Sequence, residues 1–425
     1  METYRAQWII PVESPPVEDG LLAVDGGRIA WLGSADRFRE RISKQDRIHD
    51  LGDCILLPGL INAHTHLDLT GYRGRLSPGP LFTWIEELIA LRMANETDAP
   101  ERAAVRAGAA ESLTAGVTCV GDITRNRATL EQLRESPIRK VCFLELISGA
   151  LQAPNDTGSL KSLLERWTPL ADPERLILGI SPHAPYSVTR DDLAGAAALA
   201  NSTGAPFSMH LLETMEEVQW LAGGGGPVLD FLKTRNAPNA SESRNDDVFE
   251  RLELSGVLDG SPLFAHVNYV TDEQIDRLAD CAASVAWCPR AHRFFGHEPH
   301  RWREMLDRSV NVCLGTDSAA SNESLSILDE MRQVRAEYPD VPPETILEMG
   351  TIRGARGLGL DHLVGSLKAD KRADFIAVPI DTDEPSNPAT NLLDGAAPVI
   401  GTWIDGVDMD PSRSAGVMPS NDPRS

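Results

Sequence analysis

Eight short apolar segments, each followed by sequence of helical period, most limit how this chain can fold. The segments are rich in β-branched residues, and stretches such as AAVRAGAAESLTAGV between them space apolar residues as a helix does. Strands that alternate with helices favour a parallel sheet, so eight such units predict an α/β fold, a (β/α)8 TIM barrel. In chain order the segments are ILLPGLINAHTH, VTCVGDI, KVCFLEL, LILGISPH, PFSMHL, PLFAHVN, SVAWCPR and VNVCLGTD.

Strand-like runs also flank this region at both ends. AQWIIPV, GLLAVDGGRIAWLG and DCILLPG precede it, with a hairpin signal at DGG, and ADFIAVP and APVIGTWIDGV follow it. We therefore expect a small β-sandwich assembled from residues 1–57 and 362–410, around a barrel of residues 58–361. Residues 411–425 are rich in Pro, Ser, Asn and Arg, which predicts a disordered tail.

A polar stretch interrupts the alternation after the fifth strand. GGGGP and TRNAPNASESRNDD fall within residues 223–248 and carry many turn-forming residues. The composition predicts a surface loop, and a mobile lid over the site is the alternative.

The charge balance limits the partners of the chain. A formal net charge of -23 excludes nucleic acid and anionic membranes as main partners, because both require clustered Lys and Arg. No apolar stretch is long enough to span a membrane, and the N-terminus lacks the apolar core of a secretion signal. The six cysteines are scattered without a CxxC pair, which is typical of reduced cysteines in the cytoplasm. We expect a cytoplasmic protein that acts on a small molecule.

Polar residues end several of the predicted strands. His64 and His66 are two residues apart, so an extended strand projects both imidazoles from one face. His210 closes the fifth strand and Asp317 the eighth. Because active sites of such barrels gather at the carboxyl ends of the strands, these residues predict a site for one divalent metal, zinc or alternatively iron. A second metal would need a bridging ligand, but Lys140 begins its strand instead of ending it.

Two further strand-end groups are suited to moving protons. Glu213 follows His210 by three residues and can reach a water activated by the metal. Alternatively, Glu213 is an acid that favours the N-terminus of a helix. His266 ends the sixth strand and can orient the water or stabilise charge at the attacked carbon.

Four residues are candidate substrate contacts. His183 follows the fourth strand, and Trp84 can stack on a ring, although it can equally anchor a helix. Arg290 and Arg293 follow the seventh strand and suit a carboxylate or phosphate on the substrate, or else pair with acidic surface residues.

The motifs PGLINAHTHLD, SPHAPYS, MHLLET, WCPR and LGTDS resemble the amidohydrolase superfamily over nearly the whole chain. The chain looks most like the single-metal cytosine/adenosine deaminase-related branch, which includes chlorohydrolase-like, S-adenosylhomocysteine deaminase-like and aminodeoxyfutalosine deaminase-like enzymes. The resemblance implies His64, His66, His210 and Asp317 as metal ligands, Glu213 as proton shuttle, His266 and Asp317 as aids to the water, and Trp84 and His183 as substrate contacts. It also allows a homodimer.

The reaction that the resemblance implies is deamination of an adenine-type ring. Activated water attacks the ring carbon, Glu213 protonates the ring nitrogen, and ammonia leaves. The segment CPRAHRFFGH is similar to aminodeoxyfutalosine deaminases of the alternative menaquinone pathway, whose benzoate Arg290 or Arg293 would bind. Nucleoside deaminases of the branch carry an acid beyond the tryptophan, where this chain has Arg92 and Met93, so any ribose must be recognised differently.

Two alternatives stay open. The metal core is compatible with another leaving group, such as chloride on a triazine or a cyclic amide, because the pocket selects the leaving group. A catalytically silent binding paralogue would be expected to lack part of the constellation.

Overall fold

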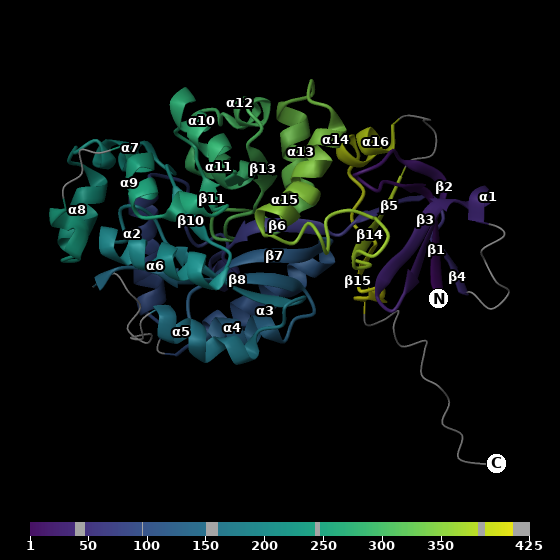
Figure 1. Ribbon diagram of the computed structural model, residues 1–425, viewed down its shortest axis with the longest axis horizontal. Helices are drawn as coiled ribbons and strands as arrows, with labels where there is room; N and C mark the ends of the chain where they lie inside the picture. The colour runs from purple at the N-terminus through teal and green to yellow at the C-terminus, as the bar shows by residue number, and fades with distance from the viewer. Residues whose placement is uncertain (39–46, 96, 150–159, 243–246, 381–386, 411–425) are drawn as a thin grey trace, which may run out of the picture.

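The computed structural model describes residues 1–38, 47–95, 97–149, 160–242, 247–380 and 387–410. Strands surrounded by helices form the larger part of the molecule, and a β sheet lies at one end (Figure 1). The predicted tail at 411–425 lies outside the described residues.

Two four-stranded parallel sheets form the centre of the larger part. One has the order β6-β7-β8-β9 and the other the order β10-β11-β12-β13. Single parallel bridges link the two sheets at both edges, Ile180 to Phe207 and Thr65 to Asp317. The fold is therefore α/β in two halves, and no continuous eight-stranded barrel is detected in the described part of the chain. The strands are β6 (Leu60–Thr65), β7 (Val117–Thr124), β8 (Arg139–Leu146), β9 (Leu176–Pro182), β10 (Ser208–Leu211), β11 (Leu263–His266), β12 (Ser284–Trp287) and β13 (Asn311–Leu314).

Helices cover the outside of these sheets and bury their apolar side chains against them (Figure 1). Side-chain caps begin several helices: Asn126 and Thr271 form capping boxes, and Thr189 and Thr214 each accept a hydrogen bond from a backbone N–H of the first turn. No helix in the described residues is long and apolar enough to cross a membrane. The helices are α2 (Leu81–Met93), α3 (Ala99–Thr114), α4 (Arg127–Arg134), α5 (Leu160–Trp167), α6 (Arg190–Thr203), α7 (Met215–Leu221), α8 (Pro227–Thr234), α9 (Val248–Leu254), α10 (Asp272–Asp280), α11 (Pro289–Phe295), α12 (Trp302–Asp307), α13 (Ile327–Glu337), α14 (Pro343–Met349) and α15 (Ile352–Gly357), with 3₁₀ turns at η1 (Leu67–Tyr72), η3 (Thr168–Leu170), η4 (Pro238–Ser241) and η5 (Val257–Asp259).

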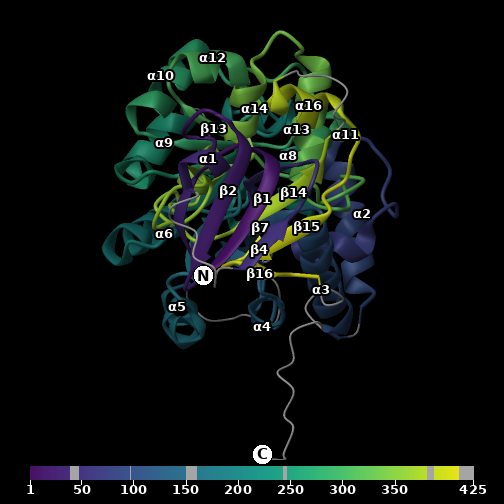
Figure 2. The same cartoon turned by 90° about the vertical axis from the view of Figure 1, so that its right-hand side faces the viewer.

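Both ends of the chain contribute to one eight-stranded sheet (Figure 2). β5 pairs antiparallel with β14, which joins the N-terminal and C-terminal segments. Tyr4, Phe375 and Trp403 pack together on it, and the Phe375 and Trp403 rings stack at 4.8 Å. A β domain built from both ends is what the strand pairing supports, and its sandwich form stays a prediction. The order is β16-β15-β14-β5-β1-β2-β3 with β4 beside β1, for β1 (Glu2–Ile9), β2 (Val17–Asp25), β3 (Arg28–Ser34), β4 (Arg47–Asp50), β5 (Cys54–Pro58), β14 (Phe375–Pro379), β15 (Gly401–Ile404) and β16 (Val407–Asp408); α1 (Ala35–Phe38) and α16 (Pro388–Asp394) accompany them.

The segment ILLPGLINAHTH, predicted as one strand, is divided at Gly59. β5 belongs to the eight-stranded sheet, whereas β6 belongs to the parallel sheet. A Cβ at Gly59 would lie 2.1 Å from Thr118 Oγ1, so only glycine allows the chain to pass this point. This crossing carries the chain from the β sheet to the strand that bears His64 and His66.

The prediction of a loop for residues 223–248 is wrong for α8. Pro227 occupies the first turn, and Val228, Phe231 and Leu232 are buried at helical spacing. Tertiary burial of this short apolar stripe outweighs the polar sequence around it. Residues 243–246 lie outside the described residues.

Candidate metal centre

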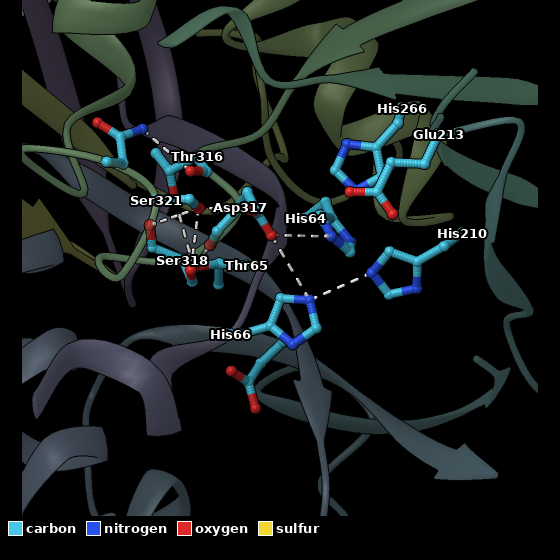
Figure 3. A network of polar contacts seen from close by, with 12 residues as sticks. His64, Thr65, His66, His210, Glu213, His266, Thr316, Asp317, Ser318 and Ser321 are labelled. Carbon is cyan, nitrogen blue, oxygen red and sulfur yellow. Dashed lines mark hydrogen bonds and ion pairs between the residues drawn. The ribbon is translucent and has the colours of Figure 1, made fainter. Parts of the chain in front are cut away.

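The four predicted ligands converge on one point (Figure 3). His66 Nε2 lies 3.2 Å from His210 Nε2 and 3.7 Å from Asp317 Oδ1, and His64 Nε2 lies 3.8 Å from the same oxygen. The ligand atoms form two overlapping groups, and within each group they lie within 4.8 Å of one another. One group is His64, His66 and His210, and the other is His64, His266 and Asp317. The structure thus brings together residues that are up to 253 positions apart in sequence (317 − 64).

The burial and the unused nitrogens of the His64 imidazole are what a metal ligand requires. Both of its nitrogens are buried and have no hydrogen-bond partner among the described residues, and His266 Nε2 is in the same condition. Burial, followed by the neighbouring histidines, holds the pKa of His64 well below its usual value. A neutral imidazole with a free lone pair is the form that binds a divalent cation. This set of donors therefore fits a divalent metal ion.

Neighbouring groups fix which ligand atoms point inward. His210 Nδ1 lies 3.0 Å from the carbonyl oxygen of His183, so Nδ1–H donates to it and Nε2 is left for the centre. Ser321 Oγ donates to Asp317 Oδ2 at 2.5 Å, which leaves Oδ1 facing His64 and His66. Burial raises the pKa of Asp317 to about 6 and lowers that of His210 to about 3.

Side chains of β6 hold the turn that carries Asp317. Asn62 Nδ2 donates to Thr316 Oγ1 at 2.7 Å, and Asn62 Oδ1 accepts from the Thr316 N–H at 3.1 Å. Thr65 Oγ1 donates to the Asp317 carbonyl at 2.9 Å. Asp317 itself has a φ of +56°, in the left-handed region that non-glycine residues seldom adopt. Sequence reasoning missed Asn62, Thr65 and Ser321, because their roles depend on contacts between distant strands.

Glu213 and His266 lie beside the ligands. Their side chains approach within 3.6 Å, from His266 Nε2 to Glu213 Oε1. Burial, then Asp317 and Glu217, raises the pKa of Glu213 well above its usual value. Glu217 accepts a hydrogen bond from the Glu213 N–H at 2.9 Å, and Asn268 Nδ2 donates to the Glu213 carbonyl at 2.9 Å. The sequence analysis did not identify this contact of Glu217, although its spacing of four from Glu213 was visible.

A cavity opens over the centre. It is open to solvent on one side and has both apolar and polar walls. His66, His210, Glu213 and Asp317 line one part of it. Its apolar walls include Leu81, Trp84, Ile85, Leu88, Phe231 and Phe295, and its other polar residues include Arg92, Arg125, Glu145, His183, Tyr186 and Ser187.

Trp84 and His183 line this cavity, and their role as substrate contacts stays a prediction. Trp84 packs edge-on against Phe295 at 5.4 Å, and its Nε1 is buried with no hydrogen-bond partner in the described residues. His183 Nδ1 lies 2.7 Å from Ser187 Oγ, and burial lowers its pKa to about 4.

Arg290 and Arg293 line a separate, neighbouring hollow together with Arg73. Arg290 donates to Ser324 Oγ at 2.7 Å and to Glu323 Oε2 at 2.8 Å. The arginines that the structure brings to the cavity are instead Arg92 and Arg125. Arg125 directly follows β7, so the strand-end rule that identified His210 and Asp317 could have found it.

Comparison with known proteins agrees with this architecture. Residues 55–408 match the amidohydrolase family. A 5-methylthioadenosine/S-adenosylhomocysteine deaminase of Moorella thermoacetica is 31% identical over 389 residues, covering 87% of this chain and 83% of the relative. An aminodeoxyfutalosine deaminase of Deinococcus radiodurans is 29% identical over 349 residues, covering 80% of this chain and 81% of the relative.

Solved structures share the fold. An adenosine deaminase from Xanthomonas campestris with bound zinc superposes with a TM-score of 0.82 at 23% identity, covering 98% of this chain and 96% of the other. Helicobacter pylori aminofutalosine deaminase in complex with methylthio-coformycin gives 0.81 at 23% identity, covering 96% and 100%.

Proposed function

We propose the function of this chain from one premise: it belongs to the amidohydrolase family. It is a metal-dependent hydrolase that deaminates an adenine-type nucleoside, with an aminodeoxyfutalosine-like compound as the preferred candidate. The observation that carries this proposal is the convergence of three imidazoles and the Asp317 carboxylate at a cavity that Glu213 also lines. Relatives named as deaminases of such nucleosides support the same reaction.

The finer architecture is part of the proposal. A (β/α)8 barrel is supported by the isolated β-bridges that join the two parallel sheets at both edges. It is also supported by the similarity of the fold to solved deaminase structures. We place the barrel at residues 58–361 and the β-sandwich at 1–57 and 362–410. The homodimer and the cytoplasmic location stay predictions.

The family and the donor set imply one divalent metal, and we propose zinc, with iron as the alternative. His64, His66, His210 and Asp317 would hold it, since nitrogen and oxygen donors of this kind suit zinc. When bound, the metal supplies a Lewis acid that lowers the pKa of water to about 7.

Glu213 moves the proton in this mechanism. Water adds to the amino-bearing ring carbon, its first proton passes through Glu213 to the ring nitrogen, and its second passes to the departing amine, which leaves as ammonia. The raised pKa of Glu213 allows its carboxyl to keep the proton between the two transfers. His266, 3.6 Å from Glu213, orients the water, and Asp317 accepts a hydrogen bond from it.

The substrate ring would lie between Trp84 and His183, which line the cavity. Arg290 and Arg293 line the neighbouring hollow, so they would meet only a substituent that extends past the turn from Asp317 to Ser321. A second function, hydrolysis at chloride of a triazine or at a cyclic amide, uses the same centre.

Ammonia release from a panel of compounds tests the proposal. Adenosine, methylthioadenosine, S-adenosylhomocysteine and aminodeoxyfutalosine would be compared with guanine and chlorotriazines, using the Glu213→Gln variant as the background. We expect turnover of at least one adenine nucleoside. Chloride release from triazines alone would replace deamination by the second function, and metal-loaded protein without turnover of any compound would favour a silent paralogue.

A further inference from the structure

The backbone turns directly after β11, at the residue that is proposed to orient the water. His266 has a φ of +69° and Val267 a φ of +54°. Both values lie in the left-handed region, which a β-branched residue such as valine seldom adopts. Such a conformation persists only where surrounding contacts hold it. The contacts that hold this turn therefore decide where the His266 side chain lies.

One of these contacts comes from His300, which lies between α11 and α12. His300 Nε2 is 2.8 Å from the carbonyl oxygen of His266, and His300 is buried. A carbonyl oxygen only accepts, so Nε2 carries the hydrogen that makes this bond. Nδ1 has no hydrogen-bond partner among the described residues, and burial lowers the pKa of His300 to about 3. His300 is thus a neutral ring that donates its one N–H to the turn.

Trp287, the last residue of β12, fixes the orientation of the His300 ring. The two rings are stacked, with centroids 5.1 Å apart and planes 19° apart. Trp287 stacks in turn on Trp302, with centroids 5.5 Å apart. Because a ring stacked on a buried indole has few orientations, the fold itself aims Nε2 of His300 at the His266 carbonyl.

Asn268, two residues after His266, joins the same turn to Glu213. Its Nδ2 donates to the Glu213 carbonyl oxygen at 2.9 Å, and its backbone N–H donates to the Leu212 carbonyl oxygen at 3.0 Å. On the other side, its Oδ1 lies 3.1 Å from His292 Nδ1. Since β10 and β11 are adjacent parallel strands, these contacts fasten the ends of the two strands to each other.

The two side-chain donors act on the two residues that handle protons. His300 holds the backbone of His266, and Asn268 holds the backbone of Glu213. In the resulting arrangement, His266 Nε2 lies 3.6 Å from Glu213 Oε1 (Figure 3). In the described part of the chain, neither His300 nor Asn268 lines the cavity. They can therefore affect the reaction only through Glu213 and His266.

We propose that His300 and Asn268 are positioning residues for the proton transfer. Their two N–H donors keep the side chains of His266 and Glu213 at the separation that the transfer requires. A displacement of about 1 Å at a reacting group can cost ~100-fold in rate, so two hydrogen bonds outside the cavity can control kcat. The proposal rests on the proposed function, in which Glu213 moves the proton and His266 orients the water.

Two substitutions at His300 separate the hydrogen bond from the packing. His300→Phe keeps a ring that can stack on Trp287 and removes the N–H donor, whereas His300→Gln removes the ring and keeps an N–H donor. We expect His300→Phe to lower kcat by ~10–100-fold with KM within about twofold, and His300→Gln to keep kcat within about threefold. Ammonia release from the nucleoside that the native chain turns over fastest makes the measurement. Metal content should stay that of the native chain, and thermal unfolding shows that each variant is folded.

Asn268→Leu gives an independent test on the Glu213 side. Leucine has the branching of asparagine without its N–H, so kcat should fall by ~10–100-fold while the metal content is kept. His297→Phe is the matched control, because His297 belongs to the same segment as His300 and its Nδ1 lies 3.2 Å from the Tyr269 hydroxyl. Its kcat should stay within about twofold of the native value.

The outcomes separate this proposal from the proposed function. Equal losses of kcat in His300→Phe and His300→Gln, or in His300→Phe and His297→Phe, would overturn the positioning role while deamination stands. If His300→Phe does not fold, Asn268→Leu decides in the same way, and full activity in it overturns the proposal.

Crystal structures of the variants decide the proposal even if the native chain releases ammonia from no nucleoside, in which case the proposed function fails. In His300→Phe or Asn268→Leu, we expect His266 Nε2 and Glu213 Oε1 to move apart by about 1 Å. An unchanged separation of these two atoms would overturn the positioning role.

Discussion

The two four-stranded parallel sheets, called here the β6–β9 half and the β10–β13 half, contribute different groups to one cavity. The β10–β13 half supplies most of the groups suited to chemistry, which are His210, Glu213, His266 and Asp317. The β6–β9 half supplies His64 from β6 and His66 directly after it, and otherwise a charged wall and His183. Both sets lie at the carboxyl ends of their strands, so position in the fold does not distinguish them.

The two sets of residues differ in the contacts that their own side chains make with one another. In the β10–β13 half the groups face one another, as His266 and Glu213 do at 3.6 Å. In the β6–β9 half, Arg92 and Asp68 form an ion pair, whereas Arg125 and Glu145 line the cavity without an ion pair between them. Groups that converge can share a metal and a proton, whereas groups that stay apart are left to meet the substrate. On the proposed function, we expect the β10–β13 half to carry most of the proton transfer and the wall of the β6–β9 half to contact the substrate.

Metal content should show the largest difference. We expect about one zinc or iron per native chain, and nearly complete loss in Asp317→Ala, because one of the donors is removed. His183→Asn should keep the metal, since the contact of His183 with His210 uses its backbone carbonyl. Elemental analysis of purified protein makes the measurement. Equal loss in both variants would mean that the His183 side chain also holds the metal.

Glu213→Gln should lower kcat by ~10²–10⁴-fold, because a positioned carboxyl that transfers the proton is lost. Metal content should remain that of the native chain, which separates this residue from the ligands. Steady-state ammonia release measures kcat. Full activity in the variant would remove Glu213 from the mechanism.

Trp84→Phe should lower kcat/KM by ~5–10-fold, chiefly through KM, because the buried Nε1 donor is lost while an aromatic wall remains. Trp8→Phe, on β1 in the eight-stranded sheet, is the control and should be kinetically silent. A change confined to kcat would place Trp84 with the catalytic groups instead.

The smallest effect concerns the stability of the β10–β13 half. Glu330 is buried, accepts hydrogen bonds from Asn322 Nδ2 at 2.7 Å and the Arg290 N–H at 3.0 Å, and so supports the segment after Asp317. Burial raises the pKa of Glu330 from 4.5 to about 7. A raised folded-state pKa stabilises the fold fully below pH 4.5, and this contribution is lost as the pH rises through 7.

A glutamine at position 330 does not titrate, so the stability of Glu330→Gln relative to the native chain should increase by about 3 kcal/mol between pH 4.5 and 8. Urea unfolding at several pH values measures this difference. A difference independent of pH would mean that folding leaves the pKa of Glu330 unchanged.

The strand-end pattern predicted much of the local arrangement. A side-chain period of two along a strand places His64 and His66 on one face, and apolar runs that stop at His210 and His266 mark the carboxyl ends of strands. Other features depended on contacts between distant segments. The break at Gly59 follows from the side chain of Thr118, and the helix α8 from burial of Phe231.

The sequence by itself determined which chemistry is available: His64 and His66 on one strand face, and acids and imidazoles at the ends of apolar runs. Only the tertiary structure decided which of them meet. Asp317 lies within 3.8 Å of His64 because Asn62 and Thr65 hold its turn, while Arg125 and Glu145 line the cavity and Arg290 and Arg293 line the neighbouring hollow. The physical reason is that local periodicity sets the face of a side chain, whereas its neighbours depend on how strands far apart in sequence pack together.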